Sequence, residues 1–180
     1  MMIYALLAEG FEEIEALTPV DVLRRVGLEV KTVGITGRVV TGSHGIPVTA
    51  DIVPEEMTDH IDLLILPGGM PGAANLNTWQ GINALLEKTI SEGGRIGAIC
   101  AAPMIIGSRG YLKGRHAVCF PGFEATLAGA TIVKGGRVIT DGPFTTAIGM
   151  GAALEFATEL VSCLCGIDAA AQIYTDTLGK

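Results

Sequence analysis

Short apolar runs alternate with amphipathic stretches along almost the whole chain, and this alternation limits the folds open to it. Residues Met2–Ala8 form a continuous apolar run, and Asp62–Leu66 is a second, largely apolar one. Such runs are typical of strands buried on both faces of a parallel sheet. Residues Glu12–Val26 instead repeat their apolar positions at close to helical period and stop at Gly27. The alternation predicts a doubly wound, mainly parallel α/β sheet sandwiched by helices.

The remaining elements are expected from the same patterns. Further strands are expected at Glu29–Ile35, Arg95–Ile99, His116–Phe120, Thr131–Val133 and Arg137–Asp141, with a small hairpin formed by Val39–Val40 and Pro47–Ala50. Further helices are expected at Trp79–Glu92, Ala101–Gly107, Thr145–Leu164 and Ile167–Thr177. Because no repeat or linker interrupts the 180 residues, we expect one domain spanning residues 1–180.

Composition excludes several classes of partner. The net charge is −7 and no basic run occurs, which argues against nucleic-acid binding. No stretch approaches the roughly 20 apolar residues of a membrane span, and the first residues do not resemble a signal peptide. We therefore expect a cytoplasmic location with reduced thiols. The four cysteines and three histidines show no metal-ligand spacing, so no metal is expected.

Cys100 is the candidate nucleophile. It follows the apolar strand Arg95–Ile99 and precedes Ala101 at the start of an expected helix. This order of strand, sharp turn, nucleophile and helix describes a nucleophile elbow. Strand ends of open α/β folds bind ligands, and a helix N-terminus favours the thiolate over the thiol. The alternative is a small buried cysteine without chemistry.

Two other strand ends are expected to meet Cys100 at the same edge of the sheet. The first opens a helix that carries Glu12, Glu13 and Glu15, and carboxylates there can simply be helix caps. Glu15 differs because it lies among apolar neighbours, which can raise the pKa of its carboxyl group and suit it to proton transfer. The second is the turn at Gly68 and Gly69, which permits close backbone approach and can direct N–H groups at an oxyanion.

No histidine offers itself as a base for Cys100. A Cys–His mechanism needs an imidazole within hydrogen-bond reach. His116 begins the strand after the Cys100 helix and is expected at the far end of the sheet. His44, in the glycine-rich hairpin, could reach an active site of its own chain or of a partner, although a surface role is the simpler interpretation.

Four segments, taken in order, resemble the ThiJ/PfpI superfamily and, within it, the DJ-type branch named for the Parkinson disease protein. They are Glu9–Glu15, Pro19–Gly27, Asp62–Gly69 and Ala98–Pro103. The resemblance implies a flavodoxin-like fold of the class I glutamine amidotransferase type, and a homodimer. It also implies that Cys100 is a reactive, oxidation-prone thiol with Glu15 as its acidic partner. Gly69 and Ala101 would supply the oxyanion N–H groups.

The chain departs from the family pattern at several candidate pocket positions. Some members place a histidine near Phe120, where this chain has Cys119 beside it, so a protease-type Cys–His pair is not expected. Many relatives have an arginine where this chain has Asp141, shortly before Pro143, which would remove a donor for an anionic group near the mouth. The following stretch, Thr145–Gly151, is longer than the family pattern and is expected to extend the helix or reshape the pocket.

The function expected from these residues is chemistry on small reactive carbonyls. The Cys100 thiolate would add to a 2-oxoaldehyde such as methylglyoxal, and Glu15 would move the proton, giving a glyoxalase or deglycase that needs no cofactor. The first alternative is a redox-responsive, chaperone-like stress protein whose Cys100 is oxidised to a sulfinate. Further alternatives are an intracellular peptidase or amidase, and a module that binds a ligand such as flavin.

Overall fold

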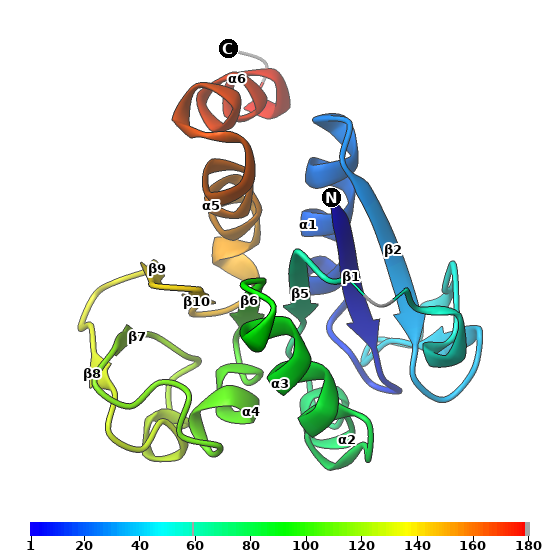
Figure 1. The fold of residues 1–180 in the computed structure, drawn as a ribbon, viewed down its shortest axis with the longest axis horizontal. Coiled ribbons are helices and arrows are strands. Elements are labelled where there is room, and N and C mark those ends of the chain that lie inside the picture. Colours follow the sequence, from blue (N-terminus) through cyan, green and yellow to red (C-terminus); the bar gives the residue numbers. More distant parts are fainter. Residues whose placement is uncertain (59, 179–180) are drawn as a thin grey trace.

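A six-stranded sheet in the order β2-β1-β5-β6-β10-β9 lies between two layers of helices (Figure 1). The structure is a computed structural model that describes residues 1–58 and 60–178. The strands of the sheet are β1 (Met2–Leu7), β2 (Glu29–Gly34), β5 (Leu63–Leu66), β6 (Arg95–Ile99), β9 (Val138–Asp141) and β10 (Phe144–Ala147). All neighbours pair in parallel except β9 and β10, which are antiparallel. The predicted doubly wound, mainly parallel sheet is confirmed.

Helices cover both faces of the sheet, and smaller elements extend its edges. The helices are α1 (Glu13–Arg25), α2 (Gly72–Thr78), α3 (Ile82–Ser91), α4 (Pro103–Gly107), α5 (Ala153–Cys165) and α6 (Ile167–Leu178). Two small sheets pair β3 (Val39–Thr41) with β4 (Pro47–Thr49) and β7 (His116–Ala117) with β8 (Thr131–Ile132). Single-turn 3₁₀ helices span Pro54–Glu56, Glu124–Thr126 and Met150–Ala152. Among the described residues, no helix has the length and apolar character needed to cross a bilayer.

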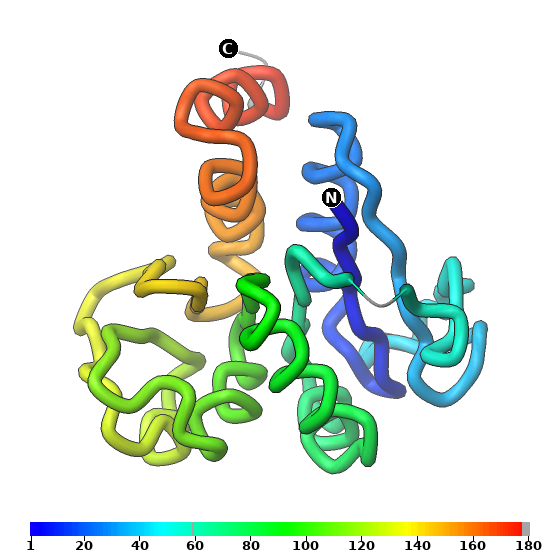
Figure 2. The backbone as a smooth tube through the Cα atoms, in the orientation of Figure 1, coloured from blue at the N-terminus to red at the C-terminus, as the bar shows by residue number. Residues whose placement is uncertain are grey.

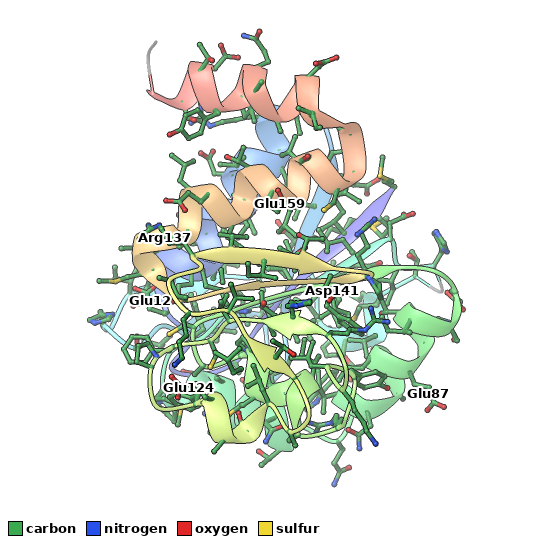
Figure 3. All side chains as sticks on the ribbon, turned by 90° about the vertical axis from the view of Figure 1, so that its left-hand side faces the viewer. Glu12, Glu87, Glu124, Arg137, Asp141 and Glu159 are labelled. Carbon is green, nitrogen blue, oxygen red and sulfur yellow. The ribbon has the colours of Figure 1, made fainter. Side chains whose placement is uncertain are left out.

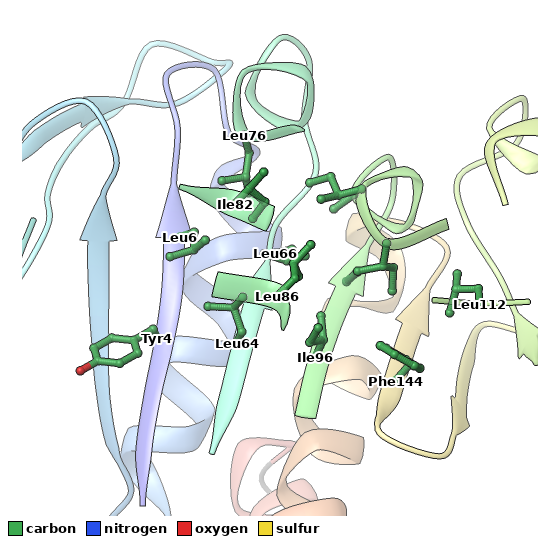
Figure 4. Close-up of a cluster of buried hydrophobic side chains, with 14 of the residues drawn as sticks. Tyr4, Leu6, Leu64, Leu66, Leu76, Ile82, Leu86, Ile96, Leu112 and Phe144 are labelled. Atoms are coloured by element: carbon green, nitrogen blue, oxygen red, sulfur yellow. The ribbon is translucent and has the colours of Figure 1, made fainter. Parts of the chain in front are cut away.

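The central strands are apolar on both faces because each face has its own core. In β1, Tyr4 and Leu6 belong to the cluster under α2, α3 and α4 (Figure 4). The alternate residues Ile3 and Ala5 belong to the cluster under α1, α5 and α6. This division follows from the two-residue period of side chains along a strand. It explains the continuous apolar runs in the sequence.

The predicted helix over residues 145–164 is wrong in its first part. Phe144–Ala147 forms strand β10, buried between β6 and β9, and α5 begins only at Ala153. The two polar threonines in this strand conceal it in the sequence. Thr146 Oγ1 accepts a hydrogen bond of 3.0 Å from the Val118 N–H, and Thr145 Oγ1 lies 2.9 Å from Thr140 Oγ1. These bonds satisfy the hydroxyl groups inside the protein, while β-branching suits them to a strand.

Two further predictions need correction. Helix α2 was not expected, because Gly72–Thr78 has too few apolar residues to show a helical period. The expected strand His116–Phe120 is limited to His116–Ala117, after which the chain turns away. Figure 2 shows the chain between α4 and β9, in green to yellow, gathered beside β10 at one side of the molecule. This lobe supplies one wall of the cavity described below.

Candidate active site

Cys100 follows the last residue of β6 and has a strained backbone conformation. Its φ angle is 65°, the only positive φ of a residue other than glycine in the part of the chain that the structure describes. Two hydrogen bonds of 2.8 Å hold it there, from the Cys100 N–H to the Ala147 carbonyl and from the Phe120 N–H to the Cys100 carbonyl. Non-glycine residues adopt this conformation at a cost and mostly at functional sites. The predicted elbow geometry is therefore present.

Glu15 projects from the first turn of α1 toward Cys100. Glu12 caps this helix, with its carboxylate accepting a hydrogen bond of 2.7 Å from the Glu15 N–H. Glu15 itself is only 1% exposed, and its Oε2 accepts a bond of 3.0 Å from the Gly68 N–H. Its side chain also hydrogen-bonds Cys100. Glu15 therefore differs from the capping carboxylate of Glu12, as its apolar neighbours in the sequence predict.

Burial controls the ionisation of both side chains. It raises the pKa of Glu15 to about 7, although hydrogen bonds from Cys100 and from the backbone of Gly68 and Met150 work in the opposite direction. Burial, followed by the charge of Glu15, raises the pKa of Cys100 to about 12. At neutral pH the Cys100 thiol is therefore protonated, and the adjacent Glu15 carboxylate has the pKa of an effective general base.

The pKa of Cys100 is raised overall, contrary to the expectation that a helix N-terminus favours the thiolate. Helix α4 begins at Pro103, after a turn, and has five residues. The backbone N–H groups of Gly69 and Ala101 do hydrogen-bond the sulfur and lower its pKa, but burial and Glu15 outweigh them. These are the two groups expected to form an oxyanion hole, and the structure brings both to Cys100.

Gly68 leaves no room for a side chain between the two catalytic candidates. A Cβ atom there would lie 2.5 Å from Glu15 Oε2 and 2.7 Å from Cys100 Cβ. It would also lie 2.9 Å from the backbone oxygen of Ile99, which cannot move without distorting β6. Glycine at this position is therefore a condition for the contact between Glu15 and Cys100.

Gly68→Ala is expected to destabilise the protein and to disrupt the site. Overpacking of this kind costs about 1–3 kcal/mol of unfolding free energy, and displacement of reacting groups by about 1 Å can lower turnover about a hundredfold. Denaturant unfolding and the carbonyl assay described below measure the two effects. Gly94→Ala is the matched control, since its Cβ would crowd the Ile61 carbonyl at the other end of β6. Equal loss of turnover in both variants would contradict the assigned role of Gly68.

A cavity of about 540 Å³ opens beside Cys100. Cys119 and Phe120, both predicted pocket residues, line it. Cys119 is buried, and burial raises the pKa of its thiol to about 11. The complete lining is Val118, Cys119, Phe120, Pro121, Glu124, Ile132, Val133, Lys134, Gly135, Gly136, Ile148, Gly149, Met150 and Gly151. The end of the stretch that was expected to reshape the pocket, Ile148–Gly151, lines this cavity, whereas the expected extension of the helix does not occur.

Asp141 and Pro143 do not belong to this pocket, contrary to the sequence-based expectation. The turn between β9 and β10 lies at the amino end of β6, where the Pro143 carbonyl accepts a hydrogen bond from the Ile96 N–H. Asp141 instead binds the His116 N–H at 2.8 Å and Arg115 at 3.3 Å. In Figure 3, Asp141 lies at the far end of β9 from Glu12, Glu124 and Arg137. His116 lies at that far edge, as predicted.

His44 contacts Glu13 rather than Cys100. Its Nδ1 lies 3.0 Å from Glu13 Oε2, and its backbone N–H donates to Glu13 Oε1 at 2.9 Å. Burial opposes ionisation of Glu13, but the bonds with His44 hold the Glu13 pKa below its usual value, and Glu13 raises the pKa of His44. Potential ligand atoms of Glu12, Glu13 and His44 lie within 4.8 Å of one another, a cluster that the sequence spacing did not reveal. Capping and the Glu13–His44 pair account for it.

Gly149 and Met150 are site residues that the sequence analysis did not single out. Gly149 has a φ of 153°, and a Cβ on it would lie 3.8 Å from Glu15 Oε1 and 3.9 Å from Cys100 Sγ. The backbone of Met150 hydrogen-bonds Glu15. The sequence feature that could have identified them is the glycine-rich turn after β10. It can be interpreted only when β10 is recognised as a strand that ends beside β6.

Comparison with known proteins gives a consistent match. The DJ-1/PfpI family model matches residues 1–163. Among solved structures, Drosophila melanogaster DJ-1beta superposes with a TM-score of 0.93 at 30% identity, covering 98% of this chain and 97% of that chain. A mutant of a DJ-1 superfamily protein from Salmonella typhimurium gives 0.91 at 32% identity, with the same coverage.

Some curated relatives are named as DJ-1 homologues and others by an enzymatic activity. Protein DJ-1 homolog B of Arabidopsis thaliana is 36% identical over 93% of this chain, but the chain spans only 39% of that protein's length. A Pyrococcus abyssi protein named deglycase is 32% identical over 91% of this chain and 99% of its own length. A Caenorhabditis elegans protein named glutathione-independent glyoxalase is 31% identical over 88% of this chain and 85% of its own.

Proposed function

Because this chain belongs to the DJ-1/PfpI family, we propose that it is a cysteine-dependent enzyme that converts small 2-oxoaldehydes such as methylglyoxal into 2-hydroxy acids. The observation that carries the proposal is the pair of half-buried Cys100 and buried Glu15, in which a carboxyl group with a pKa of about 7 hydrogen-bonds a thiol. The relatives named deglycase and glutathione-independent glyoxalase support the same class of substrate. Early glycation adducts would be handled by the same thiol.

The first step is addition of sulfur to the aldehyde carbon. Glu15 accepts the proton of the Cys100 thiol as the S–C bond forms and the C=O double bond opens, and it then passes that proton to the new oxyanion. The N–H groups of Gly69 and Ala101, which face the sulfur, stabilise the developing negative charge. The product of this step is a hemithioacetal.

The second step moves a proton between the two substrate carbons. The Glu15 carboxylate removes the proton from the former aldehyde carbon and returns it to the neighbouring carbon, while the hydroxyl proton on the first carbon's oxygen moves to the oxygen of the second. The first carbon is thereby oxidised and the second reduced. The resulting thioester of a 2-hydroxy acid is cleaved by water, which releases the acid and restores the thiol. The net reaction adds one water to methylglyoxal and gives lactate.

Activity is expected to rise with pH and then level off near pH 7. Below its pKa of about 7, Glu15 is protonated and cannot accept the thiol proton, so the rate falls about tenfold for each pH unit. Above that value the base is ionised, and Cys100 keeps its proton until about pH 12. Lactate formation from methylglyoxal without glutathione, followed from pH 5 to pH 9, measures the profile.

The same assay separates the proposed enzyme from a redox-responsive protein. If wild type forms no lactate at any pH, while peroxide adds two oxygens to Cys100, the thiol would act as a sensor instead. A rate that falls as the pH rises through 7 would contradict Glu15 as the base. Cys165→Ser, which alters an exposed thiol on α5, serves as a control that retains the wild-type profile.

A further inference from the structure

The cavity beside Cys100 is mostly apolar, although the proposed chemistry at the reacting carbonyls requires only polar groups. Seven of its lining residues are apolar: Val118, Phe120, Pro121, Ile132, Val133, Ile148 and Met150. The charged side chains in the lining are those of Glu124 and Lys134. A volume of about 540 Å³ falls in the range of sites for small molecules, about 300–1,000 Å³, and greatly exceeds what the methyl group of methylglyoxal needs.

Gly149 connects this cavity to the reacting atoms. A Cβ on Gly149 would stand 3.4 Å from the Phe120 ring and 3.9 Å from Cys100 Sγ, so this lining residue lies next to both the cavity wall and the sulfur. Met150 lines the cavity and binds Glu15 through its backbone. The Phe120 N–H bonds the Cys100 carbonyl at 2.8 Å, which fixes the opposite wall.

From this continuity we infer that the cavity is an apolar subsite for the chain attached to the reacting carbonyls, and that the preferred substrates are 2-oxoaldehydes with a longer alkyl or aryl group. The inference rests on the proposed function and specifies its substrate class. A buried methylene contributes a transfer free energy equivalent to about a fourfold gain in binding. The dicarbonyl end would lie at Cys100 and Glu15, and the chain would extend past Gly149 along Phe120.

The test compares methylglyoxal, propylglyoxal and pentylglyoxal as substrates of the full chain. We expect kcat/KM to rise about fourfold for each added methylene. In Gly151→Leu the increase should disappear, because Gly151 lines the cavity and a Cβ there meets open space. Ala171→Leu, which adds the same side chain to an exposed position of α6, is the control that retains the increase. The inference would be overturned if kcat/KM did not change with chain length in wild type, or if it rose as steeply in Gly151→Leu as in wild type.

A second measurement separates failure of the subsite from failure of the proposed function. The unreactive ketones 2-butanone, 2-hexanone and 2-octanone are titrated calorimetrically, and their Kd should fall about fourfold per methylene in wild type but not in Gly151→Leu. Tighter binding of 2-octanone without turnover of any 2-oxoaldehyde would overturn the enzyme and support the subsite. Turnover of methylglyoxal without any effect of chain length on kcat/KM or on Kd would support the enzyme and overturn the subsite.

Discussion

Cys100→Ser is expected to lower kcat for methylglyoxal by about a thousandfold or more, the order of loss seen when one member of a nucleophile–base pair is removed. Serine keeps the size and the hydrogen bonding of the side chain, so the elbow and the contact with Glu15 survive. A hydroxyl group is far less acidic than a thiol, and a base with a pKa of about 7 does not activate it without further help. Initial rates of lactate formation at pH 8 measure the loss.

The control for this variant is a second thiol in the same neighbourhood. Cys119 is buried and lines the cavity next to Phe120, so a general effect of losing a thiol would also follow from Cys119→Ser. Only the Cys100 variant is expected to show a loss that no increase in substrate concentration restores. Turnover within threefold of wild type in Cys100→Ser would remove the thiol from the mechanism and leave the proposed chemistry without a nucleophile.

Glu15→Gln is expected to make the protein more stable than wild type at alkaline pH. The Glu15 pKa of about 7 in the folded protein, against a usual value of 4.5, corresponds to about 3 kcal/mol. Below pH 4.5 Glu15 is protonated in both the folded and the unfolded chain, and the difference in pKa has no effect on the unfolding free energy. Between pH 4.5 and 7 the folded protein binds the proton more tightly, so its unfolding free energy falls as the pH rises. Above pH 7 the full cost of a buried carboxylate is present.

Urea unfolding of wild type and Glu15→Gln at pH 5 and pH 8 measures this effect. The difference in unfolding free energy between the two proteins should shift by about 2–3 kcal/mol in favour of the variant from pH 5 to pH 8. Other carboxylates titrate in both proteins, so their contributions to the unfolding free energy cancel in the comparison. The variant should also lose the inflection of the rate near pH 7. An unchanged difference between pH 5 and pH 8 would show that Glu15 is not the buried group that titrates there.

Most of the sheet could be predicted because the central strands β1, β5 and β6 are almost wholly apolar. The sequence also placed Cys100, Glu15, Gly68 and Gly69 at one edge, since the carboxyl ends of parallel strands must meet there. What it could not predict was the ionisation of the thiol. That depends on the depth of burial and on the distance to one carboxylate, whereas the motif suggests only the opposing influence of a helix N-terminus.

Several of the errors share one origin, which is the strand β10. Its threonines are satisfied by partners such as Val118 and Thr140, whose positions are set by the tertiary fold. The family pattern suggested a place for Asp141 near the pocket mouth, whereas the pairing of β9 with β10 carries it to the opposite edge of the sheet. The missed strand also hid Gly149 and Met150, because the turn that contains them was assigned to a helix.

The two hydrogen bonds that hold the backbone of Cys100 have a consequence for how substrate is received. In one, the Cys100 N–H donates to the carbonyl of Ala147, at the end of the strand that leads into Gly149. In the other, the Phe120 N–H donates to the Cys100 carbonyl. The nucleophile, the end of β10 and the cavity residue Phe120 are thereby parts of one preorganised unit. Little free energy of reorganisation is then spent when substrate enters, and the site favours ligands that already match its shape over those that would require it to adapt.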